Sequence, residues 1–317
     1  MKVVSCESHV VATPPPHIGG MYWIFVKLGT ACGIEGVGEV YAATFHPQVV
    51  VAAIEDVFER YLKGRDPHHL ERLYRETYSS GFTQRPDLTM MGVLSGLEMA
   101  CWDIVGKAAG QPVHALIGGK LHDRLRSYTY LYPRAPGGEY DYDNVELAVE
   151  CALEQKALGF TALKFDPAGP YTAYCGHMLS LEALEKSATF CQRIREAVGN
   201  GCDLLFGTHG QMTPASAIRL AKRLEPFDPL WFEEPVPPGQ SEAMARVADH
   251  TSIPVATGER LTTKYEFHDL LRHQAASILQ MNLGRVGGIL EGKKIAALAE
   301  VHYAQIAPHL YNGPVGA

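Results

Sequence analysis

The chain has 317 residues, of which 46% are hydrophobic and 20% charged, and its formal net charge is −7. This balance is typical of a soluble globular protein, and without a Lys/Arg block it argues against nucleic acid or an anionic membrane as a partner. The N-terminus is polar, and no stretch reaches the ~18 consecutive apolar residues of a membrane span, so we expect a cytoplasmic protein. Its seven cysteines are scattered and form no CxxC pair, which predicts reduced thiols.

The first part of the chain predicts an α+β domain over residues 1–120. Residues 21–39 alternate like two strands around a turn, and glycines punctuate this stretch. The GVGE segment at 36–39 lacks the spacing of a phosphate-binding loop, so we interpret it as a hairpin turn. Residues 47–110 have apolar positions at helical spacing.

The second part, residues 121–317, predicts a modified TIM (β/α) barrel, so that the whole is an α/β protein with a capping domain. Short apolar runs alternate here with amphipathic helices, as in repeated βα units. The seven runs are SYTYLY, TALKFD, DLLFGTHG, PLWFEEP, PVATGE, ASILQMN and AQIAPH. Because residue 317 follows closely on the seventh run, we expect a barrel without its eighth strand and without a carboxy-terminal cap segment.

Two glutamates are the strongest candidates for a metal site. Glu233 and Glu259 lie 26 residues apart, and each follows a short apolar run that predicts a buried parallel strand. The carboxyl ends of barrel strands meet at one rim, where carboxylates can bind Mg²⁺ and leave positions for substrate. The alternative is that they cap helices or form salt bridges. Glu234 is the more structural neighbour, because adjacent strand residues face opposite sides.

Lysine and histidine residues at the same rim are candidates for proton transfer. Lys164 ends the second apolar run, where burial near a metal would lower its pKa and favour a neutral base, although it could instead pair with Asp166 or a rim glutamate. His309 follows the seventh run and His209 the third. Either imidazole can carry a proton at neutral pH, or can simply be a hydrogen-bonded rim residue. His17 lies in a loop that could fold over the site, or be an ordinary polar loop.

The ordered motifs resemble the mandelate racemase and muconate lactonizing group of the enolase superfamily over almost the whole chain. They are Lys164-Phe165-Asp166, Gly207-Thr208-His209, Glu233-Glu234-Pro235, Gly258-Glu259 and Ala307-Pro308-His309, with support from GIEGVGE at 33–39, ACWDI at 100–104 and GRVGGI at 284–289.

The resemblance implies an enzyme that removes the proton α to a carboxylate and stabilises an enediolate with Mg²⁺. It implies that Glu233 and Glu259 are metal ligands, and that Lys164 and His309 are acid–base residues on opposite faces of the substrate. The placement of His209 resembles that in sugar-acid dehydratases, where such a histidine protonates the departing hydroxyl. We also expect His17, Asp166 and Asn282 to bind substrate, a small sugar acid, and the protein to be a homo-oligomer.

Two positions depart from the family pattern. Gly207 stands where the third metal ligand, an aspartate, is expected, and the nearest acid, Asp203, lies at the start of its strand. Water or His209 could fill that place. Asn282 stands where the family has an aspartate beside the histidine, so it can orient His309 but stabilises its cation less well. Racemisation is therefore less favoured.

Several functions stay open from the sequence. The first is acid-sugar dehydration, and its close competitor is cycloisomerisation of an anhydro or lactone sugar acid, in which the leaving oxygen stays tethered. A metal-independent glycoside hydrolase would use two carboxylates but leave Lys164 without a role. A non-catalytic barrel is compatible with Gly207 and Asn282. Specificity would come from loops such as 13–20 and 167–177.

Overall fold

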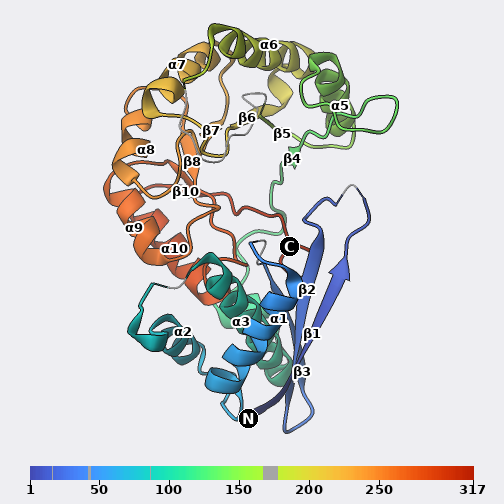
Figure 1. Cartoon of the computed structure of the whole chain (residues 1–317), viewed down its shortest axis with the longest axis vertical. Helices are drawn as coiled ribbons and strands as arrows, with labels where there is room; N and C mark the ends of the chain where they lie inside the picture. The colour runs from blue at the N-terminus through green and yellow to red at the C-terminus, as the bar shows by residue number, and fades with distance from the viewer. Residues whose placement is uncertain (16, 42–43, 86, 167–177) are drawn as a thin grey trace.

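The computed structural model of the chain describes residues 1–317 except 16, 42–43, 86 and 167–177, so the predicted specificity loop at 167–177 lies outside the described residues. Two bodies lie end to end (Figure 1). The N-terminal strands and helices form the lower body, and a curled sheet with helices along its outer side forms the upper one.

The N-terminal body is an antiparallel sheet, in the order β1-β2-β3, packed against α1 and α3. Its elements are β1 (Val3–Ala12), β2 (Tyr22–Thr30), β3 (Glu35–Val40), α1 (Pro47–Val57), η1 (Phe58–Leu62), α2 (Leu70–Tyr78), η2 (Ser80–Phe82), α3 (Leu88–Ala109) and α4 (Val113–Leu116). The predicted hairpin and helices are confirmed. Strand β1 was missed, because most of its side chains are exposed and it carries little apolar periodicity.

The GVGE segment is a strand and not the predicted turn. It lies within β3, and the turn is formed by the residues before it, where Gly33 has a φ of 82°. The glycines serve close packing: a Cβ atom on Gly38 would lie 1.9 Å from the carbonyl oxygen of Gly96 in α3, and one on Gly36 would lie 2.2 Å from that of Ala100. Strand and helix backbones therefore pack directly against each other.

The upper body is a parallel sheet in the order β10-β9-β8-β7-β6-β5-β4. All seven predicted strands are confirmed. Its elements are β4 (Thr129–Tyr130), α5 (Val145–Ala157), β5 (Ala162–Phe165), α6 (Leu181–Val198), η3 (Gly199–Gly201), β6 (Asp203–Gly207), α7 (Pro214–Leu224), η4 (Glu225–Phe227), β7 (Trp231–Glu233), α8 (Ser241–Ala248), β8 (Val255–Thr257), α9 (Lys264–Arg272), β9 (Ile278–Leu279), α10 (Ile289–Val301) and β10 (Gln305–Ile306). Within the described residues the sheet is a half-barrel whose edges are β4 and β10.

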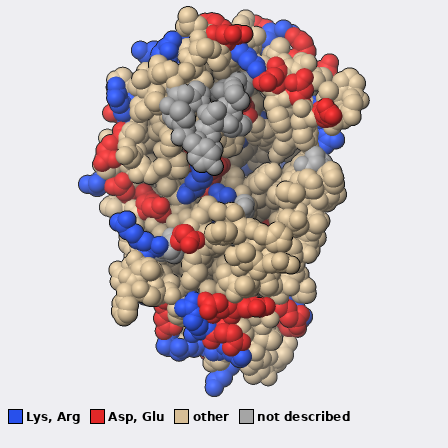
Figure 2. Space-filling view, in the orientation of Figure 1, with Lys and Arg blue, Asp and Glu red and all other residues tan. Residues whose placement is uncertain are grey.

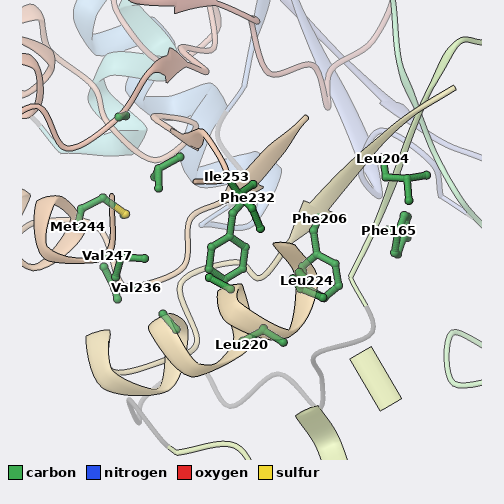
Figure 3. Packing of buried hydrophobic residues seen from close by; sticks show 14 of the residues in the cluster. Phe165, Leu204, Phe206, Leu220, Leu224, Phe232, Val236, Met244, Val247 and Ile253 are labelled. Carbon is green, nitrogen blue, oxygen red and sulfur yellow. The ribbon is translucent and has the colours of Figure 1, made fainter. Parts of the chain in front are cut away.

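Alternation along the strands divides the upper body into two apolar layers. Outward residues such as Phe165, Phe206 and Phe232 pack under the helices, with ring centroids 5.7 and 6.1 Å apart along this row (Figure 3). Inward residues form a smaller cluster inside the curl, namely Ala162, Leu205, Trp231, Ala256 and Ile278. Because strand side chains alternate with a period of two, the next inward positions at the carboxyl ends include the polar residues Lys164, Glu233 and Gln280.

The apolar clusters support two domains. One cluster contains buried residues between Val3 and Val105, and the larger one contains residues between Leu131 and Ala299. The division at residues 120 and 121 stays a proposal. Helix α3 has the length and apolar composition of a membrane span, but 83% of its most apolar window is buried in the protein, as expected of a core helix.

A buried carboxylate joins the two bodies. Glu98 on α3 accepts hydrogen bonds from the backbone N–H groups of Ile289 and Leu290, the first two residues of α10, at 2.8 and 2.9 Å. It also accepts a hydrogen bond from the Trp102 indole at 2.8 Å. These donors are otherwise unsatisfied at a helix start. Burial nevertheless raises the pKa of Glu98 to about 7, because desolvation penalises the carboxylate.

This raised pKa predicts a stability that depends on pH. A group whose pKa is higher in the folded state contributes stability that is fully present below its ordinary value of 4.5 and lost as the pH rises through about 7. Between pH 4.5 and 8, the free energy of unfolding of the wild type should therefore fall relative to Glu98→Gln, by as much as roughly 3 kcal/mol. Urea denaturation across this range measures it. Exposed Glu196→Gln is the control, and parallel profiles for Glu98→Gln and the wild type would contradict the assignment.

Candidate active site

The carboxyl ends of the central strands bring a lysine and a glutamate into direct contact. Lys164 on β5 donates to Glu233 Oε1 on β7, and both side chains are buried. Glu233 Oε2 accepts from the Gln280 amide at 2.7 Å and the Trp231 indole at 3.0 Å. Three donors therefore hold this carboxylate in place.

The ion pair with Glu233 governs the pKa of Lys164. Burial acts to lower it, as predicted, but the negative charges of Glu233 and its neighbours outweigh burial and raise the pKa overall. The ion-paired lysine therefore has a raised pKa, and the lowered pKa expected of Lys164 beside a metal stays a prediction. A neutral amine at Lys164 requires another positive charge to take its place beside Glu233.

Glu259 and His309 form the second pair of the site. Glu259 follows β8, and its Oε2 lies 3.3 Å from His309 Nε2. Asn282 fixes the imidazole: its Oδ1 accepts from the Gly284 N–H, and its Nδ2 lies 2.9 Å from His309 Nδ1. Nδ1 is thus an acceptor and Nε2 carries the proton.

Burial sets the protonation of this pair. It lowers the pKa of His309 to about 4, with Lys164 and Arg285 acting in the same direction against the attraction of Glu259. Burial would raise the pKa of Glu259, but His309, Lys164 and other nearby donors lower it overall. At neutral pH the pair is therefore a carboxylate that accepts a hydrogen bond from a neutral imidazole.

His209 has the opposite tendency. It follows β6 in a left-handed backbone conformation with a φ of 51°, and its Nδ1 lies 2.9 Å from Asp166 Oδ2. Asp166 is buried and also accepts from the Tyr130 hydroxyl. Burial acts to lower the pKa of His209, but the hydrogen bond and charge of Asp166 raise it overall. His209 is therefore placed to carry a proton near neutral pH.

The third position of the expected metal site contains no acid. Gly207 ends β6, while Asp203 lies at the start of the strand, as the sequence indicated, and pairs there with Arg126 at 2.6 Å. In the described part of the chain, no three His, Cys, Asp or Glu residues converge as a complete metal site. Glu233 and Glu259 still fit Mg²⁺, which often takes one or two protein carboxylates and completes its shell with water and substrate oxygens.

Two further residues singled out from the sequence have partners of their own. Glu234 is buried and accepts from Arg260 Nε at 2.8 Å, which fits the structural role expected of it. His17 Nδ1 lies 3.2 Å from Thr13 Oγ1, and its contact with substrate stays a prediction. Acidic and basic side chains surround a hollow in the middle of the molecule (Figure 2).

Sequence reasoning missed two site residues. Arg285, in the loop after β9, donates to the carbonyl oxygen of Glu259 at 2.7 Å, and its guanidinium lies 4.2 Å from the ring centroid of Tyr41. Tyr41 comes from the N-terminal body and stacks near His309. The position of Arg285 after a strand end could have indicated the rim, but nothing in the sequence relates Tyr41 to it.

Comparison with known proteins identifies the family. Residues 15–118 match the N-terminal domain of mandelate racemase / muconate lactonizing enzymes, and residues 146–317 match the enolase C-terminal domain-like family. The chain belongs to the mandelate racemase/muconate lactonizing enzyme family. It is therefore an enzyme of the enolase superfamily, as its ordered motifs predicted.

Members of this family with sequences or structures similar to the chain include named dehydratases. D-galactonate dehydratases from Xanthomonas oryzae pv. oryzae and Ralstonia pickettii are each 35% identical over 293 residues, which is 92% of this chain and 72% of theirs. A crystal structure of a putative mandelate racemase/muconate lactonizing enzyme from Burkholderia SAR-1 has 74% identity and a TM-score of 0.98, covering all of this chain and 78% of that one. A putative galactarate dehydratase from Agrobacterium radiobacter, with bound Na and L-malate, has 29% identity and a TM-score of 0.85, covering 100% and 76%.

The pairing of His209 with Asp166 gives a direct prediction. The Asp166→Asn substitution removes the negative charge that favours the imidazolium, so the pKa of His209 should fall. Titration of the histidine Cε1–H resonances by NMR measures this change. Asp203→Asn, at the far end of β6, should leave the His209 titration unchanged. An unchanged pKa in Asp166→Asn would show that Asp166 does not control the proton on His209.

Proposed function

We propose that this enzyme is an acid-sugar dehydratase, which removes the proton α to the carboxylate of a sugar acid and expels the neighbouring hydroxyl as water. The observation that carries the proposal is the Asp166–His209 pair beside the buried Lys164–Glu233 pair. Asp166 raises the pKa of the His209 imidazole, which suits a general acid. The names of the relatives agree with this class of reaction.

The roles of the residues follow from their charges. Mg²⁺ held by Glu233 and Glu259 would supply positive charge to the substrate carboxylate and compete with Lys164 for Glu233. Lys164, once neutral, takes the α-proton, and the electron pair left on carbon forms the enediolate. As the enediolate collapses, the β-carbon–oxygen bond breaks and His209 gives its proton to the leaving hydroxyl. The enol that results moves its proton from the C2 oxygen to C3 and becomes a 2-keto-3-deoxy acid.

His309 is the residue that disfavours racemisation. Its Nε2–H points to Glu259 and its pKa is low, so it binds through a hydrogen bond and does not accept the proton from the opposite face of the substrate. Asn282 offers an amide instead of a carboxylate, which leaves the imidazolium without a stabilising partner. A cycloisomerase would use the same base and acid with a tethered leaving oxygen, so analysis of the product distinguishes the two reactions.

The cytoplasmic location and the homo-oligomer also stay predictions.

Substituting His209 should separate the two halves of the reaction. In His209→Asn, the rate of dehydration should fall about 10²–10⁴-fold because the general acid is lost, while exchange of the C2 proton with D₂O continues through Lys164. Proton NMR of a panel of aldonic and aldaric acids in D₂O with Mg²⁺ reports both steps. Exposed His302→Asn is the control. Equal loss of exchange and elimination would place His209 in the first step instead, and no exchange with any acid in the wild type would reject the proposed function.

Gly207 predicts that the protein alone holds its metal weakly. The backbone at Gly207 is ordinary strand, and an added Cβ would lie 3.3 Å from Lys164 Cε and 3.4 Å from Asp166 Cβ, so an aspartate there requires the end of the Lys164 side chain to shift by a few tenths of an ångström. Gly207→Asp should raise the affinity for Mn²⁺ about tenfold or more, measured by electron paramagnetic resonance without substrate. Gly201→Asp, remote from the site, should have no effect. Unchanged affinity in Gly207→Asp would mean that another group already fills the position.

A further inference from the structure

Arg285 is a buried cation without a carboxylate partner. Only 8% of the residue is exposed, yet no carboxylate of the described residues lies within the 4.0 Å of an ion pair. Its Nη1 donates to the backbone oxygen of Glu259, and its Nε has no hydrogen-bond partner in the described structure. Because arginine stays protonated and buried charges are normally paired, this guanidinium lacks an anion.

The open edge of the guanidinium has the geometry for a carboxylate. Nη1 donates to the backbone oxygen of Glu259, so the edge formed by Nε and Nη2 remains available for another acceptor. Two N–H groups on one edge of a guanidinium can bind a carboxylate in a bidentate manner. The ring of Tyr41 lies 4.2 Å from the guanidinium carbon and holds its plane in position. The Tyr41 ring also stacks near His309, which places the open edge beside the catalytic residues.

The sheet separates Arg285 from the other cation of the site. Lys164 belongs to β5, and Arg285 follows β9, four strands further along the curled sheet. Glu259 lies between them, with its backbone oxygen bound to Arg285 and its carboxylate next to His309. A substrate whose reacting carboxylate lies at Lys164 and Glu233 would therefore extend toward Arg285.

We propose that Arg285 binds the second carboxylate of a dicarboxylic sugar acid, so that the enzyme prefers an aldaric acid to the matching aldonic acid. This inference rests on the proposed function, because it takes Lys164 as the end where the substrate reacts. Tyr41 acts as a positioning residue, since it contacts the guanidinium and orients its open edge. The terminal hydroxyl of an aldonic acid would leave the charge of Arg285 without an anion.

The test measures binding in a background that does not complete the reaction. In His209→Asn with Mg²⁺, isothermal titration calorimetry compares a six-carbon aldarate with the aldonate of the same stereochemistry. The aldarate should bind about ten to a hundred times more tightly, the difference expected for one charged hydrogen-bonded pair. Adding Arg285→Gln should remove most of this preference while leaving the affinity for the aldonate within about threefold.

Two further variants separate binding from folding. Arg285→Lys keeps the charge without the bidentate edge, so it should retain part of the preference for the aldarate, and Arg272→Gln on the exposed face of α9 should retain all of it. Thermal melts establish that each variant is folded. In the enzyme with His209 intact, Arg285→Gln should raise KM for the aldarate more than it lowers kcat.

The outcomes distinguish the two proposals. Equal affinity for both acids in the parent protein, or an equal loss for both in Arg285→Gln, would overturn the assignment of Arg285 to a second carboxylate. A preference for the aldarate that depends on Arg285, without any exchange of the C2 proton in the enzyme with intact His209, would uphold the anion site and reject the dehydratase function.

Discussion

The structure of the site depends on the concentration of buried negative charge at the carboxyl ends of β7 and β8. Glu233, Glu234 and Glu259 are all nearly inaccessible to water, and each ionised carboxylate must be compensated where it lies. Glu234 is compensated by Arg260, Glu233 by Lys164, and Glu259 by the Nε2–H of His309. The catalytic candidates are therefore the partners that these acids require.

Compensation of this kind also gives the two histidines different protonation states. His309 is deeply buried near two cations and stays neutral, while the carboxylate of Asp166 beside His209 raises the pKa of that imidazole. One fold thus provides a hydrogen-bond donor and a proton donor from the same residue type. The distinction comes from the neighbours of each imidazole and cannot be read from the histidines themselves.

The sequence predicted the elements whose periodicity is set by local burial. The seven parallel strands, Lys164, Glu233, Glu259 and the two histidines could be placed because each follows an apolar run. Direct packing of β3 on α3 could not be foreseen, since glycines in a strand look the same as glycines in a turn. Tyr41 and Arg285 come from different bodies, so their contact could be found only in the three-dimensional structure. The pKa of Lys164 depends on its distance to Glu233, which the sequence does not give.

The segment after His309 returns to the N-terminal body. Buried Glu39 on β3 accepts hydrogen bonds from the backbone N–H groups of Gly313, Val315 and Gly316, and Asn312 accepts from Asn282 at 3.0 Å. His309 is thus only four residues from a clamp on the opposite body, which also carries Tyr41. A hinge motion of the N-terminal body would carry the tyrosine ring away from the imidazole, which Asn282 holds on the upper body, and would pull on the segment that follows His309. Admission of substrate and assembly of the catalytic geometry would then depend on the same motion.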